Sequence, residues 1–273
     1  MPTVTPLIKV NRTKSYGAEV ILYGDVYDDS CAYAEKLAQE RGSTFVHPFD
    51  DLDIVAGQGS IAMEIVQELP TVDYILAPVG GGGLITGVST LAKMLNPKIK
   101  VIGVEPAAAP SMTMALASGE PVTLDSANTI ADGTAVKRVG DRIFEYAKKN
   151  IDQMLTVEDD ELVGAFLDMV ENHKMIVENS GLLTVAALKQ LDLKGKKAVA
   201  ILSGGNMDVI TMSSIVQHGL IQRDRIFSAS VLLPDKPGQL ALVAQTIADA
   251  QGNVIKLEHN QFVSTNRNAA VVL

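Results

Sequence analysis

Apolar residues along the chain follow two alternating patterns. Short runs rich in Val and Ile lack the polar alternation of a half-exposed strand, which predicts buried parallel strands at Ala18–Tyr23, Tyr74–Val79, Lys100–Val104 and Lys197–Ser203. Between them, Ala, Leu, Ile and Met recur every three or four residues, which predicts helices over Asp29–Arg41, Asp53–Leu69, Leu84–Leu95, Val136–Lys149, Asp159–Lys174 and Gly181–Leu191. The alternation predicts an α/β fold with an open, mostly parallel sheet and helices on both faces.

The pattern changes after Gly219, at a polar joint over residues 222–225. The residues beyond it predict a strand, a helix and two further strands, at Ile226–Leu233, Pro237–Ala250, Asn253–Asn260 and Ala269–Leu273. This βαββ order leaves an open sheet edge and an apolar end, so we expect the chain to stop inside a domain.

Composition and charge exclude several classes of protein. The 273 residues correspond to one large domain or two ordinary ones, and 47% of them are hydrophobic, which is enough for a core. The net charge of −9, with no basic block, argues against nucleic acid or an anionic membrane as a partner. Cys31 is the single cysteine and no apolar run reaches about 18 residues, so we expect a cytoplasmic protein without a membrane span.

The strongest local signal is four consecutive glycines, Gly80, Gly81, Gly82 and Gly83, between a buried strand and the helix that begins at Leu84. Glycines at this place let the backbone turn sharply and point successive N–H groups outward, and the helix adds its positive N-terminus. This geometry favours a phosphate. The spacing matches neither a Rossmann fingerprint nor a Walker loop. The alternative is a purely structural turn, which seldom needs four glycines.

A second turn, Ser203-Gly204-Gly205-Asn206, repeats this arrangement between a buried strand and the helix predicted from Met207. Ligands of an open parallel sheet lie outside the carboxyl ends of its strands, so both turns are expected to face one crevice. Ser203 would present a neutral hydroxyl there. The alternative, equally open at this point, is that Ser203 only caps the last helix.

These turns, with five further stretches, resemble the threonine ammonia-lyase (threonine dehydratase) branch of the pyridoxal-phosphate enzymes that share the tryptophan-synthase-β fold. The resemblance covers roughly residues 1–222. The matching stretches are Lys14–Val20, Gly57–Ser60, Val79–Leu84, Gly103–Glu105, Ala131–Gly133, Glu178–Gly181 and Ser203–Asn206.

The resemblance implies a cofactor site and a reaction. Gly80, Gly81, Gly82, Gly83 and Leu84 would hold the phosphate of pyridoxal 5'-phosphate, Ser203 would bond the pyridine nitrogen, and Glu178 would line the site. A hydroxyl at the ring nitrogen makes the ring a weaker electron sink, which suits elimination from threonine or serine. Residues 1–47 would end the small subdomain, and residues 48–222 would form most of the large one.

The family's Schiff-base lysine lies in a Ser-x-Lys-x-Arg-Gly motif and its substrate-carboxylate loop in a Ser-x-Gly-Asn-His motif. Neither motif occurs in this chain. Lys9, Lys14 and Lys174 lie near matching stretches, but on helix-period segments where a solvated charge is the better interpretation. We therefore assign no catalytic residue and expect a fragment, inactive alone, of a longer enzyme.

Two smaller features have structural interpretations. His47 lacks a nucleophile to pair with, which favours a structural role. In the related serine racemase, a carboxylate matching Glu105 and a later one hold a divalent cation, but Ser111 occupies the later position here, so no metal site is expected.

The residues from Ile226 to the end, 226–273, resemble part of an ACT domain, an amino-acid-sensing module. Its turn and second strand would place Asp235, Gly238, Leu240 and Asn253 at an amino-acid effector. An ordinary turn is the alternative for Asp235–Gly238. The resemblance favours a homo-oligomeric lyase acting on an amino acid; the alternatives are a non-catalytic amino-acid-sensing module and a serine racemase-like enzyme.

Overall fold

The computed structural model describes residues 1–3, 5, 7–25, 27–234, 236–260 and 269–272. The chain forms two compact units, Met1–Val216 and Gln217–Leu273. The boundary between them falls inside helix α9 (Val209–Gln222). The expected divisions at residues 47 and 222 stay predictions.

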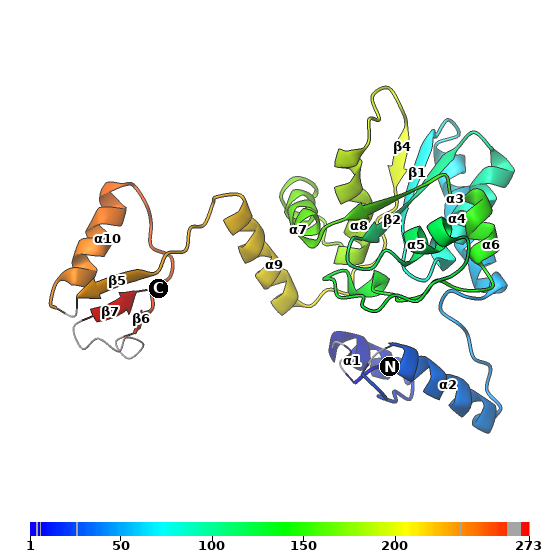
Figure 1. The fold of residues 1–273 in the computed structure, drawn as a ribbon, viewed down its shortest axis with the longest axis horizontal. Coiled ribbons are helices and arrows are strands. Elements are labelled where there is room, and N and C mark those ends of the chain that lie inside the picture. The colour runs from blue at the N-terminus through cyan, green and yellow to red at the C-terminus, as the bar shows by residue number, and fades with distance from the viewer. Residues whose placement is uncertain (4, 6, 26, 235, 261–268, 273) are drawn as a thin grey trace. The chain divides into compact units, whose positions relative to one another are not determined.

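The first unit is built around a four-stranded parallel sheet in the order β3-β2-β1-β4. Figure 1 labels β1, β2 and β4 of this sheet. Its strands are β1 (Tyr74–Pro78), β2 (Lys100–Pro106), β3 (Gln153–Val157) and β4 (Ala198–Ala200). The predicted α/β fold with a parallel sheet is confirmed. Strand β3 was not predicted, because this edge strand is only partly buried and lacks a continuous apolar run.

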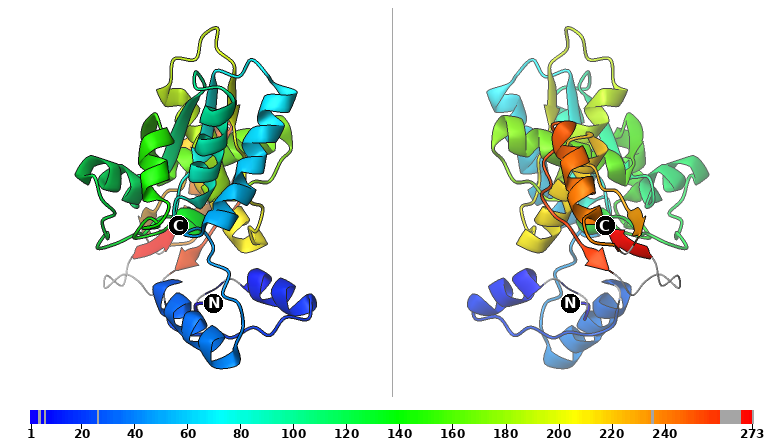
Figure 2. Two further views of the ribbon diagram at one scale, coloured as in Figure 1. Left: turned by 90° about the vertical axis from the view of Figure 1, so that its right-hand side faces the viewer. Right: turned by 90° about the vertical axis from the view of Figure 1, so that its left-hand side faces the viewer.

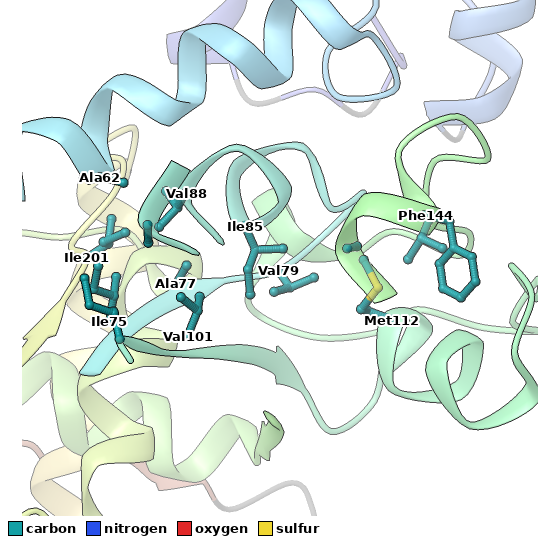
Figure 3. Close-up of a cluster of buried hydrophobic side chains, with 14 of the residues drawn as sticks. Ala62, Ile75, Ala77, Val79, Ile85, Val88, Val101, Met112, Phe144 and Ile201 are labelled. Atoms are coloured by element: carbon teal, nitrogen blue, oxygen red, sulfur yellow. The ribbon is translucent and has the colours of Figure 1, made fainter. Parts of the chain in front are cut away.

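Helices cover both faces of this sheet. Side chains along β1 alternate between the faces: Ile75 and Ala77, with Val79 just after the strand, enter one core and Leu76 enters the other. The first core is completed by α3 (Leu52–Glu68), α4 (Gly83–Leu95), α5 (Ser111–Ser118) and α6 (Phe144–Asn150), as Figure 3 shows. The second core is completed mainly by α7 (Asp159–Asp168) and α8 (Asn179–Ala187).

Two helices precede the sheet, α1 (Leu7–Ser15) and α2 (Tyr27–Arg41), and an irregular segment joins α2 to α3 (Figure 2). The strand expected at Ala18–Tyr23 is not present. Among the residues that the structure describes, only Met1 shares backbone hydrogen bonds with this run: the Met1 amino group donates to Ile21 O and the Met1 carbonyl accepts from Tyr23 N, both at 2.9 Å. Without a longer ladder an apolar run does not form a strand.

Helix boundaries differ from the sequence prediction where backbone groups find distant partners. The helix expected from Val136 begins only at Phe144. Upstream of it, Gly140 N donates to Gly81 O and Arg142 N to Asp50 Oδ1, so these groups take no part in a helix. Helix α7 continues as a π turn over Met169–His173 and α8 as a short 3₁₀ turn over Leu188–Gln190.

The second unit contains β5 (Val231–Pro234), α10 (Gln239–Asp249), β6 (His259–Asn260) and β7 (Ala269–Val272). The strands form an antiparallel sheet in the order β5-β7-β6, which gives the predicted βαββ order with shorter strands. Among the described residues of both units, no helix has the length and apolar character to cross a membrane.

Candidate functional site

The strand order places a topological switch point at the carboxyl ends of β1 and β4. From β1 the chain moves outward to β2 and β3, and then returns to the opposite side of β1 to form β4. Such a reversal is the switch point where open α/β sheets bind ligands. Leu76 of β1 pairs with Ala200 of β4, so the two glycine-containing turns that follow these strands leave the same edge of the sheet side by side.

A row of unpaired backbone N–H groups lies at the first of these turns. The first hydrogen bond of α4 runs from Thr86 N to Gly82 O at 3.0 Å. Among the described residues, none of the six N–H groups from Gly80 to Ile85 donates a hydrogen bond. Gly81, Gly82 and Gly83 are buried. Buried N–H groups are nearly always paired, so this row fits an anionic ligand, and a phosphate is of suitable size and charge.

The glycines of this turn are also required by packing. A Cβ at Gly81 would lie 2.4 Å from the Phe49 ring, and one at Gly83 would lie 2.9 Å from Phe49 Cα. Gly82 has φ +97°, a left-handed conformation that favours glycine. The structural alternative for this turn therefore holds together with the phosphate hypothesis, because the same glycines serve both.

Phe49 is a residue of the site that the sequence did not reveal. His47 Nδ1 accepts hydrogen bonds from Phe49 N at 3.2 Å and from Asp50 N at 2.7 Å, and its ring meets the Phe49 ring edge to face. Asp50 Oδ1 accepts from Ile143 N and from Arg142 N. The structural role predicted for His47 is thus to fold the short turn that places Phe49 over the glycines.

The second turn presents Ser203 beside the start of α8. Ser203 is half-buried, and within the described part of the chain its hydroxyl makes no hydrogen bond. The alternative that Ser203 caps the last helix is wrong, because α9 begins at Val209 and Asp208 provides its cap. Asp208 Oδ1 accepts from Thr211 N at 2.9 Å. The hydroxyl is therefore available to a ligand.

Glu178 lies at the N-cap position of α8, yet its carboxylate does not cap that helix. Its Oε2 atom accepts a hydrogen bond from Asn206 N at 3.0 Å, and its backbone N–H donates to Gly204 O at 3.3 Å. A cavity of about 570 Å³ lies beside these groups, with Glu178 and Asn206 in its lining. The structure thus brings Glu178 to the Ser203 turn.

The first turn of α8 also contacts the segment that covers Gly80. Asn179 Nδ2 donates to Ile130 O at 2.9 Å, and Thr134 Oγ1 lies 3.4 Å from Ser180 Oγ. A Cβ at Gly80 would lie 3.1 Å from Thr134 Cα. The start of α8 therefore connects both turns of the candidate site.

Glu105 is fully buried and serves the fold. Its Oε1 accepts from Met112 N at 2.6 Å, and its Oε2 accepts from Thr113 N at 2.9 Å and Thr113 Oγ1 at 2.8 Å. Burial raises the pKa of Glu105 and outweighs the opposing effect of these hydrogen bonds. Both carboxylate oxygens thus bind the start of α5, the helix that begins at Ser111.

The three lysines near the matching stretches have ordinary surroundings. Lys9 Nζ forms an ion pair with Asp132 Oδ2 at 3.1 Å, Lys14 is exposed, and Lys174 donates to the carbonyl of Glu171. These environments agree with the interpretation of solvated or paired surface charges.

Three of the four effector residues suggested for the second unit are described, and all three are exposed. Gly238 caps α10 with φ +89°, and Leu240 and Asn253 are exposed. Asp235 lies outside the described residues. The effector site stays a prediction.

Comparisons with known proteins agree with this geometry. The family described as "Pyridoxal-phosphate dependent enzyme" matches residues 1–204. An L-threonine ammonia-lyase of Thermotoga maritima is 41% identical over 96% of this chain, and an L-threonine ammonia-lyase of Geobacter sulfurreducens is 44% identical over 96%. The chain spans 65% of the length of each of these two relatives.

Solved structures show the same similarity. A processed threonine deaminase isoform 2 of Solanum lycopersicum has a TM-score of 0.74 at 37% identity, over 80% of this chain and 64% of that one. A serine racemase of Dictyostelium discoideum has a TM-score of 0.69 at 36% identity, over 76% of this chain and 68% of that one.

Proposed function

Since the chain belongs to the family of pyridoxal-phosphate dependent enzymes, we propose that the whole protein deaminates threonine to a 2-oxo acid and ammonia. Relatives that are 41% and 44% identical carry the name L-threonine ammonia-lyase, which supports threonine as the substrate. Serine, which has the same β-hydroxyl leaving group, is the second substrate that we propose.

The observation that carries the proposal is the row of unpaired N–H groups at the end of β1. Gly80, Gly81, Gly82, Gly83 and Leu84 would hold the cofactor's phosphate through these groups, and the positive end of α4 adds to the attraction. The buried position of the row excludes water from the phosphate and strengthens each charge-assisted hydrogen bond.

Ser203 would hold the other end of the cofactor, with its hydroxyl at the pyridine nitrogen. When bound, pyridoxal phosphate supplies an electron sink for the substrate's α-carbon. A neutral hydroxyl leaves the ring nitrogen without a proton, which weakens that sink and favours elimination of the β-hydroxyl. We assign no catalytic residue within this chain, because it contains no Ser-x-Lys-x-Arg-Gly motif.

For residues 226–273 we propose a regulatory role as part of an amino-acid-sensing ACT unit. Support comes from the βαββ order of β5, α10, β6 and β7 and from the turn at Gly238. The proposed effector residues are Asp235, Gly238, Leu240 and Asn253. We further propose a homo-oligomer in the cytoplasm.

The phosphate site can be tested with inorganic phosphate and two matched variants. Leu84 lies in the first turn of α4, so Leu84→Asp places a negative charge beside the N–H row, and Leu84→Asn is its uncharged match. We expect phosphate to shift the amide NMR signals of Gly80–Leu84 in the chain and in Leu84→Asn. Leu84→Asp should weaken phosphate binding at least tenfold, because two like charges would meet in a partly buried site.

The matched pair separates charge from packing. Both variants lose the contact of Leu84 with the first core, so only the charge distinguishes them. The proposal would be contradicted if the chain is folded but phosphate does not shift the amide signals of Gly80–Leu84. Equal phosphate affinity of the two variants would also contradict it.

A further inference from the structure

We propose that Glu178 is a positioning residue. Its carboxylate binds the backbone of the Ser203–Asn206 turn and fixes the conformation of that turn, without touching the cofactor. The inference rests on the proposed function, because the turn matters only if Ser203 holds a ligand. It gives Glu178 a defined role beyond the site-lining position that the family resemblance implies.

The first observation is where the Glu178 carboxylate points. Glu158, at the N-cap of α7, forms a capping box with Glu161 and so satisfies its own helix. Glu178 occupies the same position on α8 but makes no cap hydrogen bond. Its Oε2 instead accepts from Asn206 N, 28 residues further along the chain. The carboxylate thus connects its helix to the turn.

The second observation is that this turn has no other hydrogen-bond support. Within the described part of the chain, the backbone of residues 203–206 makes two hydrogen bonds, and both involve Glu178. Gly204, Gly205 and Asn206 are exposed, and a Cβ at Gly205 would have no atom within 4 Å. Packing therefore contributes little to the conformation of the turn beyond Gly204.

The third observation is how closely α8 approaches the turn. Gly204 has φ +83°, and a Cβ there would lie 2.2 Å from Glu178 Cδ. A Cβ at Gly181 would lie 2.0 Å from Ser203 O. Helix α8 thus lies directly against the backbone of Ser203 and Gly204, and the Glu178 carboxylate joins it to the turn at Asn206 N. Loss of that hydrogen bond should therefore loosen the turn that carries the Ser203 hydroxyl.

Two ligands separate positioning from general damage. Pyridoxine 5'-phosphate carries the ring and the phosphate but no aldehyde, so it needs no lysine; inorganic phosphate uses only the glycine turn. We expect Glu178→Ala to weaken pyridoxine 5'-phosphate binding about tenfold while phosphate binding stays unchanged. Glu178→Gln, which keeps an acceptor oxygen, should bind within about threefold of the unchanged chain.

Hydrogen exchange of the ligand-free chain gives the direct readout of the turn. Exchange at Asn206 N–H should accelerate in Glu178→Ala and stay slow in Glu178→Gln. Ser203→Ala should weaken pyridoxine 5'-phosphate about as much as Glu178→Ala, and the double variant should be no weaker than either, because both act through one contact.

Different results would contradict the proposed function and the positioning role of Glu178. If the unchanged chain does not bind pyridoxine 5'-phosphate, the proposed function fails. If it binds and Glu178→Gln loses as much affinity as Glu178→Ala, the carboxylate charge contacts the ligand directly and the positioning role is wrong. Unchanged affinity and unchanged exchange in Glu178→Ala would also overturn it.

Discussion

The two turns at the carboxyl ends of β1 and β4 are built in opposite ways. Gly81, Gly82 and Gly83 are buried, and the atoms that surround them include the backbone of Phe49. Gly204 and Gly205 are exposed, and the carboxylate of Glu178 supports their turn. The first turn is thus part of the core, whereas the second depends on one side chain.

This difference separates two tasks that a phosphate-bearing cofactor imposes on a protein. The phosphate supplies most of the charge for binding, so its cradle benefits from rigid, buried donors. The ring must be held in a defined direction with less energy, and a hydroxyl on an exposed turn can do this only if the turn is fixed. A change at the first turn should therefore lower stability more than a change at the second, and a change at the second should alter ligand discrimination.

The largest expected effect is on stability, at the first turn. In Gly83→Ala the new Cβ would lie 2.9 Å from Phe49 Cα and 3.0 Å from Phe49 O, which are backbone atoms that cannot rotate away. We expect the free energy of unfolding to fall by about 2–4 kcal/mol, measured by urea denaturation. The matched control is Gly205→Ala, whose Cβ meets nothing, and it should change stability by less than about 0.5 kcal/mol. Similar values for the two variants would erase the contrast between the turns.

The elements that depend on local composition could be predicted from the sequence. Strands β1 and β2 were predicted because their apolar runs are continuous, and the two turns because glycines are concentrated there. The strand predicted from the apolar run at Ala18–Tyr23 is wrong, because a strand also requires a partner strand. The edge strand β3 could not be predicted, because it is only partly buried and its sequence has no continuous apolar run.

The parts of the candidate site that were missed are contacts between distant segments. Phe49 covers glycines more than 30 residues away, and nothing in His47–Asp50 indicates that position. For Ser203 the sequence left a helix cap and a ligand contact equally open. The position of Asp208 at the start of α9 decided against the cap.

A smaller loss of stability is expected at the second turn, and a second substitution should recover part of it. Gly204→Ala places a Cβ 2.2 Å from Glu178 Cδ in a left-handed conformation, so we expect a loss of about 1–2 kcal/mol of stability. The clash is with a side chain, and the double variant Gly204→Ala/Glu178→Ala should therefore recover part of this loss. Urea denaturation of the two single variants and the double variant measures the coupling. Strict additivity would show that Glu178 does not press on the turn.

The smallest effect is expected at the amino ends of the strands, opposite the two turns. Near the start of β2, Asp152 accepts a hydrogen bond from Val101 N. Asp152 also forms ion pairs with Lys93 at 2.6 Å and with Lys100 at 2.9 Å. Burial raises the pKa of Asp152, but the hydrogen bonds from Lys93, Lys100 and Val101 N outweigh it, so the pKa is lowered. Its stabilisation is therefore present above the pKa of an unfolded Asp, about 3.9, and is lost as the pH falls through the lowered value.

Asp152→Asn should accordingly lower the free energy of unfolding by about 1 kcal/mol at pH 7, and the difference from the unchanged chain should shrink as the pH falls below about 4. Urea denaturation across this range measures it. Because Asp152 lies away from both turns, phosphate and pyridoxine 5'-phosphate should bind this variant as they bind the unchanged chain. A loss of either ligand here would mean that modest destabilisation alone disturbs the turns, and the separate behaviour of the two turns could then no longer be inferred from variants at Glu178.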